Sequence, residues 1–206
     1  KVQIIIIENP SMMMRMTSEL WKQTTGGDGN YIWSDKDKII SFDKYAECIM
    51  NPWNLEFNSR KLITKLYAEI KDIINDQYYN SFLQNNAILS DYIYEIISML
   101  PYNITYEINP EIDNLLKYYG VKIDDQIEDP YEKIIQFLKI SQSLMGVKLI
   151  IFVNIKNYLS IEQIKELYKQ ANYLKIQLLL IEAKESMRLP EESVIIIDKD
   201  LCFIQK

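Results

Sequence analysis

Two apolar runs that flank an amphipathic segment near the C-terminus constrain the fold more than any other feature. The runs are VKLIIFVNI at residues 147–155 and IQLLLIE at residues 176–182, and SIEQIKELYKQANYL at residues 160–174 lies between them. Continuous apolar runs of this length are typical of buried strands, and Ser160 offers a side chain that can cap a helix. Strand, helix and strand in this order require a parallel sheet with a right-handed crossover.

The two ends of the chain predict further strands of the same kind. VQIIII at residues 2–7 is a run of β-branched residues, and an amphipathic helix follows it directly. SVIIIDKDLCFI at residues 193–204 predicts two strands around a two-residue Lys-Asp turn. YIWSDKDKIISF at residues 31–42 predicts a short surface hairpin. The sheet is therefore expected to use both ends of the chain.

The residues between these strands predict helices alone. A helix follows Asn58 or Ser59, either of which can cap it, and apolar residues then recur at three- and four-residue spacings for roughly forty residues. Pro110 and Pro130 begin two further helices, because proline fits the first helical turn, and Gly120 ends the earlier of the two.

We therefore predict a discontinuous α/β head, residues 1–58 and 146–206, with an inserted all-helical leg, residues 59–145. A helix as long as the one that follows residue 58 needs a neighbour to cover its apolar stripe, and we expect the later helices of the leg to provide it. The chain opens at Lys1, at a strand and without a methionine, so we expect further residues upstream.

The residue types present argue against most kinds of catalysis. Histidine is absent from the 206 residues, which removes the usual general base near neutral pH. The phosphate-binding motif G-x-x-x-x-G-K-[ST] does not occur, and a strand that resembles one ending in a magnesium-binding aspartate ends in Asn154. We therefore expect no nucleotide cofactor and no ATP hydrolysis.

Cysteine content and hydropathy indicate the compartment. Cys48 and Cys202 are too few and too scattered for a disulfide framework or a thiolate metal site. Charges or amides interrupt every apolar run before it reaches the length of a membrane span, and a signal-peptide pattern is missing. We expect a cytoplasmic protein that does not enter the membrane.

A net charge of −6 is a poor prior for nucleic-acid binding, but local placement of lysine can outweigh it. At the start of the long helix, the face opposite the apolar stripe presents Lys61, Thr64, Lys65 and Ala68, and Arg60 lies at the helix N-terminus. Small residues between lysines would let a polyanion approach closely, and the helix dipole adds partial positive charge. An ordinary solvated helix face is the alternative, and the pattern alone favours it.

Acidic residues gather at two places in the predicted leg. One group is Glu107, Glu111 and Asp113, and the other lies within residues 124–129. Calcium accepts several oxygen ligands in loose geometry, but no EF-hand spacing is present, so a solvated acidic surface is the alternative. A metal-dependent nuclease would use the first group as its ligands.

Taken together, these segments resemble the ring-forming spacer-acquisition family of subtype II-A CRISPR systems. The strongest block is residues 118–182, where a G-V-K-I turn, F-V-N, a Y-L-S cap and an L-L-x-x-E strand end occur in order. NPWNLEFNSRKL at residues 51–62 resembles the family's entry into its long helix, and VQIIIIENPSMMMRM at residues 2–16 resembles its first head strand. The likeness covers nearly the whole chain.

The resemblance implies a head related to P-loop ATPases but without their nucleotide motifs, and a helical leg. It implies a homotetrameric ring that threads double-stranded DNA ends through a lysine-lined channel, with Ca²⁺ holding the assembly and no catalysis. Such a protein would assist the adaptation integrase and the RNA-guided nuclease in capturing new spacers for antiviral defence. The NTPase-like strand would then be kept as a scaffold.

The resemblance also favours particular residues. It favours DNA contact by Arg60, Lys61 and Lys65, and Lys36 and Lys38 of the hairpin are further candidates. For calcium, Glu107 and Glu111 are what remains of the family's acidic stretch, because Asn103 and Thr105 stand where acidic residues are expected.

A protein-binding adaptor on a degenerate NTPase fold is the rival interpretation. Such an adaptor would use the large side chains of Trp21, Trp33 and Trp53 as anchors, although tryptophan more often belongs to the core.

Overall fold

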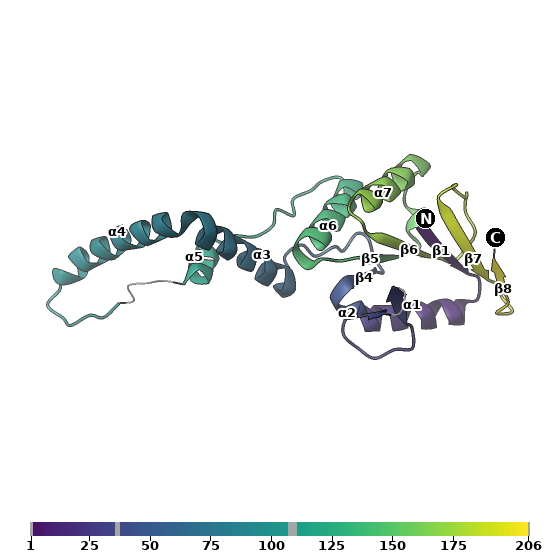
Figure 1. Cartoon of the computed structure of the whole chain (residues 1–206), viewed down its shortest axis with the longest axis horizontal. Coiled ribbons are helices and arrows are strands. Elements are labelled where there is room, and N and C mark those ends of the chain that lie inside the picture. Colours follow the sequence, from purple (N-terminus) through teal and green to yellow (C-terminus); the bar gives the residue numbers. More distant parts are fainter. Residues whose placement is uncertain (1, 36–37, 107–110, 206) are drawn as a thin grey trace. The chain divides into compact units, whose positions relative to one another are not determined.

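The computed structural model describes residues 2–35, 38–106 and 111–205 (Figure 1). The chain divides into two compact units. The α/β unit consists of Lys1–Phe57 and Asp125–Lys206, and the helical unit is Asn58–Asp124.

A six-stranded sheet in the order β4-β5-β6-β1-β7-β8 forms the centre of the α/β unit. The neighbours from β4 to β7 are parallel, and β8 runs antiparallel to β7. The strands are β1 (Val2–Ile7), β4 (Ala46–Ile49), β5 (Leu149–Val153), β6 (Gln177–Glu182), β7 (Glu192–Ile197) and β8 (Phe203–Gln205). Strand β5, helix α7 (Ile161–Tyr173) and strand β6 form the predicted β-α-β unit, which confirms the parallel sheet.

Helices cover both faces of this sheet (Figure 1). Helix α1 (Pro10–Thr24) covers one face, where its Met16 and Leu20 pack against Ile7 and Ile151. Helices α6 (Pro130–Met145) and α7 lie on the opposite face. Because both faces are buried, the central strands are almost continuously apolar, as parallel strands usually are.

Shorter elements complete the α/β unit. The predicted hairpin is confirmed as an antiparallel pair, β2 (Trp33–Asp35) and β3 (Lys38–Ile40), and the short helix α2 (Phe42–Tyr45) follows it. A 3₁₀ turn, η2 (Ile155–Asn157), follows β5.

The helical unit contains one long helical run and one short helix. Helix α3 (Arg60–Ile73) continues through the π-helical segment η1 (Ile74–Tyr78) into α4 (Tyr79–Ser98), and α5 (Ile112–Tyr118) follows. Tyr67 of α3 packs with Ile112 and Leu116 of α5 in a small core. None of the helices among the described residues is both long and apolar enough to cross a membrane.

The structure differs from the sequence prediction in the grouping of one helix. The sequence assigns residues 130–145 to the helical leg, whereas α6 belongs to the α/β unit. The apolar side of α6, including Ile134 and Leu138, is fully buried, and Phe137 packs edge-on against Phe57 at a ring separation of 6.1 Å. Within the helical unit, α5 therefore packs on α3 without α6, and many apolar side chains of α4 stay exposed.

Two smaller differences concern strands. Strand β4 is not predicted by the sequence, because its four residues AECI give too short a pattern. The final hairpin has a longer turn than Lys-Asp, since Ile197 pairs with Phe203 and the backbone amide of Asp198 donates to the carbonyl oxygen of Cys202.

Candidate nucleic-acid interface

The first turn of α3 is fixed by its own capping residue. Ser59 has an extended backbone, with φ −59° and ψ 153°, and its side chain accepts a hydrogen bond from the backbone amide of Leu62 at 3.4 Å. The carbonyl oxygen of Ser59 accepts a second bond from the amide of Ile63 at 3.0 Å. Because the cap satisfies an amide that a helix start would otherwise leave unpaired, the helix begins at Arg60.

The two faces of α3 separate apolar from cationic side chains. Leu62 and Tyr67 are buried, with 2% and 8% of their surface exposed. Arg60, Lys61 and Lys65 are all exposed in the first two turns. The helix periodicity therefore presents the predicted cationic side chains as a group to solvent, close to the positive end of the helix dipole.

The cationic group is confined to the beginning of α3. Thr64 and Ala68 are exposed between and after the lysines, and the hydroxyl of Thr64 donates to the carbonyl oxygen of Arg60 at 2.8 Å. Further along, Lys71 is also exposed, but the neighbouring Glu69 and Asp72 offset its charge on the exposed surface. A phosphate would therefore be attracted to the first two turns of α3 rather than to the whole helix.

The hairpin candidates lie in the α/β unit. Lys38 begins β3 and is exposed. Lys36 lies outside the described residues. Contact of these two lysines with DNA stays a prediction.

The predicted calcium ligands are not brought together in the part of the chain that the structure describes. Glu107 lies outside that part, and Glu111 is an exposed residue at the N-cap of α5. Among the described residues, no group of three or more acidic or cysteine side chains could hold a metal ion. Those residues therefore do not fit a calcium site by themselves.

The turn where a phosphate loop would lie in an NTPase is closed by side-chain capping. Only Glu8 and Asn9 separate β1 from α1. Asn9 accepts a hydrogen bond from the amide of Met12 at 3.1 Å, and its amide group donates to the carbonyl oxygen of Lys199 at 3.0 Å. A turn this short has no loop that could surround a phosphate with backbone amides.

Asn154, at the end of β5, has a structural contact of its own. Its backbone is left-handed, with φ 56°, and its side-chain oxygen accepts a hydrogen bond from the amide of Ala183 at 2.9 Å. The side chain thus ties the end of β5 to the residue that follows β6.

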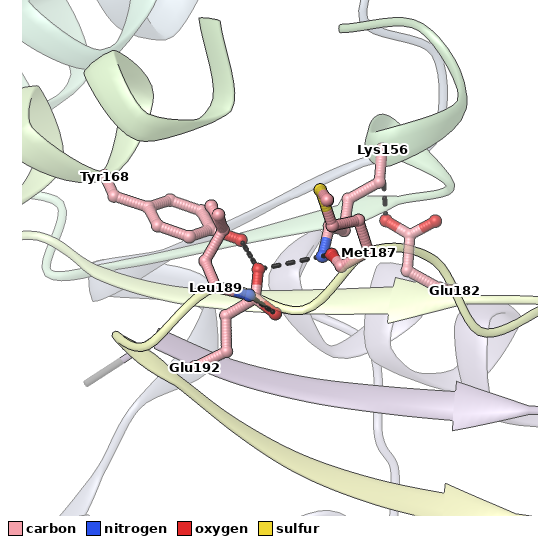
Figure 2. Close-up of polar contacts among 6 residues, drawn as sticks. All are labelled: Lys156, Tyr168, Glu182, Met187, Leu189 and Glu192. Carbon is pink, nitrogen blue, oxygen red and sulfur yellow. Dashed lines mark hydrogen bonds and ion pairs between the residues drawn. The ribbon is translucent and has the colours of Figure 1, made fainter. Parts of the chain in front are cut away.

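A buried polar network on the sheet of the α/β unit was not predicted from the sequence (Figure 2). Nζ of Lys156 donates to Oε1 of Glu192 at 2.8 Å and to the carbonyl oxygen of Met187 at 2.9 Å. The Tyr168 hydroxyl donates to the same Oε1 at 2.8 Å, and the amide of Leu189 donates to Oε2 at 3.0 Å. The network fastens the segment between β6 and β7 to the sheet.

A second carboxyl group, that of Glu182 at the end of β6, accepts a hydrogen bond from the backbone amide of Lys156 at 3.1 Å. Burial raises the pKa of Glu182 to about 7, although this hydrogen bond and the charge of Lys156 act in the opposite direction. Burial and the bond to Glu192 also raise the pKa of Tyr168, so this hydroxyl stays a neutral donor. The groups satisfy one another, which indicates a structural network. In the sequence, only Glu182 at the end of a predicted strand pointed to this network.

The predicted tryptophan anchors differ in exposure. Trp21 and Trp53 expose 50% and 46% of their surface, whereas Trp33 is half-buried and packs against Phe42 at a ring separation of 6.0 Å. Trp53 also lies edge-on against Tyr158. Two of the three candidates are therefore available to a partner.

The class defined by these observations is a mostly parallel α/β protein whose turn between β1 and α1 holds no phosphate loop, with a separate helical unit that carries exposed cations. The family model described as CRISPR-associated protein (Cas_Csn2) matches residues 23–201, so the chain belongs to this family.

Two known proteins illustrate the similarity. CRISPR-associated protein Csn2 of Streptococcus agalactiae is 26% identical over 154 residues, which are 75% of this chain and 59% of that protein. The match thus spans less than two thirds of the relative's length. Among solved structures, a bacterial Atm1-family ABC exporter with ATP bound is similar over 96% of this chain and 32% of its own, with 11% identity and a TM-score of 0.37. So low a score carries no argument about function.

Proposed function

We propose that this chain is a non-catalytic protein that binds double-stranded DNA without reading its sequence and assists spacer acquisition in CRISPR immunity. The observation that carries the proposal is the exposure of Arg60, Lys61 and Lys65 at the capped start of α3, opposite its buried face. Phosphate contacts of this kind position a protein on a duplex without specifying bases.

The proposal includes a homotetrameric ring, which reconciles DNA binding with an acidic subunit. A chain with a net charge of −6 repels a duplex as a whole. Closed symmetry repeats one cationic face in every subunit, and a ring can turn those faces inward so that positive potential adds up in the channel. The ring would thread free DNA ends.

We also propose that the α/β unit is a P-loop-NTPase-like fold kept as a scaffold. The parallel sheet and the two-residue turn between β1 and α1 support this relation and the absence of nucleotide chemistry. Family membership supports a place beside the adaptation integrase and the RNA-guided nuclease as partners. Calcium binding by Glu107 and Glu111 is kept as a proposal that the assembly experiment in the Discussion addresses.

Duplex binding by α3 can be tested with a double variant, Lys61→Glu with Lys65→Glu. We expect wild-type protein to retard linear duplex more than the same duplex closed into a circle, because a ring is threaded from an end. The variant should abolish retardation at low salt, and any residual binding should show a slope of log affinity against log salt reduced by about 2.

A matched control is Lys117→Glu with Lys122→Glu, which changes the net charge equally at two exposed lysines elsewhere in the helical unit. This control should keep most of the affinity, and light scattering should give all three proteins the same mass. Equal affinity of the α3 variant and wild type would refute the assignment of these lysines.

The alternative function is a protein-interaction adaptor that does not bind DNA. The exposure of Trp21 and Trp53 favours it, because large aromatic side chains often anchor protein interfaces. Wild-type protein that ignores linear duplex at low salt, and still binds an adaptation protein in a purified system, would establish the alternative.

A further inference from the structure

A lysine-rimmed groove lies in the α/β unit, between α7 and the starts of neighbouring strands. Its volume is about 670 Å³. The polar side chains that line it include Lys165, Lys169, Asn172, Lys175 and Gln177. The DNA-binding proposal makes no use of these residues.

The lysines of the groove are arranged along one side of α7. Lys165 and Lys169 are four residues apart, so they share a helix face at a separation of about 6 Å along the axis. Lys175 follows the helix in a left-handed conformation, with φ 57°, and all three lysines are exposed. One strand of a duplex carries a phosphate every 3.4 Å or so of axial rise, so two lysines one turn apart can meet phosphates of a single strand.

Acidic neighbours weaken this positive rim only partly. Lys169 forms an ion pair with Glu166 at 3.4 Å, but 76% of the lysine side chain is exposed. An ion pair so solvated contributes little and competes weakly with a phosphate. Glu191 also lines the groove and is the opposing charge at its rim.

The floor of the groove decides between a protein ligand and a nucleic acid. Ala171, Ile176 and Leu178 line it but expose only 1%, 5% and 4% of their surface. Their packing is already complete, so they offer no open pocket for the large apolar anchor on which most protein interfaces depend. What the groove presents is a rim of ammonium and amide donors, which is the set that contacts sugar and phosphate.

We propose that this groove, defined by Lys165, Lys169 and Lys175 with the amides of Asn172 and Gln177, is a second contact for the phosphate backbone of double-stranded DNA. The inference rests on the proposed function and extends it from α3 to the α/β unit. The ligand is one strand's sugar–phosphate backbone, and its sequence is not read.

The test uses the whole chain of residues 1–206 and a fluorescent 30-base-pair linear duplex over a range of salt. The groove variant is Lys165→Gln with Lys169→Gln and Lys175→Gln, which removes three positive charges and keeps long polar side chains. We expect the slope of log affinity against log salt to fall by at least about 2.7, the value for one contacting subunit, and the affinity at low salt to fall at least tenfold. Lys139→Gln with Lys184→Gln and Lys199→Gln removes the same charge at exposed positions outside the groove and should leave the slope nearly unchanged.

A footprint gives an independent readout on the wild-type protein. The rates of lysine acetylation, measured by mass spectrometry, should fall at residues 165, 169 and 175 when the duplex is added, and should stay constant at residues 139, 184 and 199. Unchanged slope in the groove variant together with unprotected groove lysines overturns the inference. Protection of these lysines by polyglutamate but not by duplex also overturns it and assigns the groove to an acidic polypeptide.

The outcome for the proposed function is separate. If wild-type protein binds duplex but only the α3 variant loses affinity, the proposed function stands and the groove is rejected. If the α3 variant keeps full affinity while the groove variant loses it, the groove stands and the assignment of α3 falls.

Discussion

At the scale of single residues, the ion pair between Lys156 and Glu192 helps to fix the segment between β6 and β7 in the α/β unit. Lys156 and Glu192 are 36 residues apart and form an ion pair in which only 8% and 1% of the side-chain surfaces are exposed. The free energy of removing both charges from water offsets much of their electrostatic attraction, so a buried pair is weak evidence of extra stability. Removing one partner is costly, however, because the other charge is left buried and alone.

The pKa of Glu182 predicts how stability depends on pH. Its folded value of about 7 lies above the ordinary 4.5, because burial disfavours the charged carboxylate. As pH rises from about 4.5 to 7, the unfolded chain loses this proton before the folded chain does, so the free energy of unfolding falls. The total loss is about 3 kcal/mol and is complete above the folded pKa.

The variant Glu182→Gln isolates this effect, because glutamine keeps an acceptor for the Lys156 amide but does not titrate. Urea unfolding of both proteins at fixed concentration should show the variant gaining stability relative to wild type between pH 5 and pH 8, by about 2 to 3 kcal/mol. A difference that stays constant over this range would show that the buried carboxyl does not titrate there.

At the scale of elements, local sequence signals account for most helix boundaries. In α7, Ser160 and Gln163 form a reciprocal capping box, and Asp129 caps α6 ahead of Pro130. Helix α5 ends in a Schellman motif, since the amide of Gly120 donates to the carbonyl oxygen of Lys117 and that of Val121 donates to Leu116. These endings were predictable because each is set within a few residues.

The Schellman motif of α5 makes a testable prediction. Gly120 has φ 61°, a left-handed conformation that costs an L-residue about 1 kcal/mol, while a Cβ there would meet no atom within 4 Å. Gly120→Ala should therefore lower the free energy of unfolding by about 1 kcal/mol through backbone strain alone. Gly120→Asn should cost less, because asparagine tolerates this conformation, and equal losses in urea unfolding would contradict the explanation.

At the scale of the whole molecule, the exposed surface is consistent with assembly. Helix α4 leaves apolar side chains such as Ile88 and Tyr92 exposed by 68% and 61% of their surface. Exposed apolar surface of this extent is typical of interaction sites.

Light scattering tests the proposed assembly and its metal. We expect the mass of a homotetramer with CaCl₂, and a smaller mass in excess EDTA if Glu107 and Glu111 help to hold calcium at an interface. Glu107→Gln with Glu111→Gln should then have the smaller mass in both buffers, whereas Glu69→Gln with Asp72→Asn, two exposed acidic residues outside both acidic groups, serves as the matched control. A monomer under every condition would refute the ring, and a tetramer that persists in EDTA would refute the role of calcium.

The sequence by itself determined the features that depend on local periodicity. Continuous apolar runs predicted the parallel sheet, three- and four-residue spacings predicted the long helical run, and short polar side chains marked where helices begin. The exposure of Arg60, Lys61 and Lys65 followed from the same helical period, although their role in binding DNA stays a proposal.

Only the tertiary structure decided the features that depend on distant contacts. Helix α6 belongs to the α/β unit because its apolar side packs against Phe57 and the sheet. Lys156 likewise pairs with Glu192, which lies 36 residues further along the chain. The groove exists because α7 packs beside the start of β6, which follows it in the chain, and also beside Val2 of β1, which lies far from it in the chain. A local pattern indicates which face of a helix or strand is apolar. It does not indicate which other element packs against that face, because the packing partner depends on how the whole chain folds.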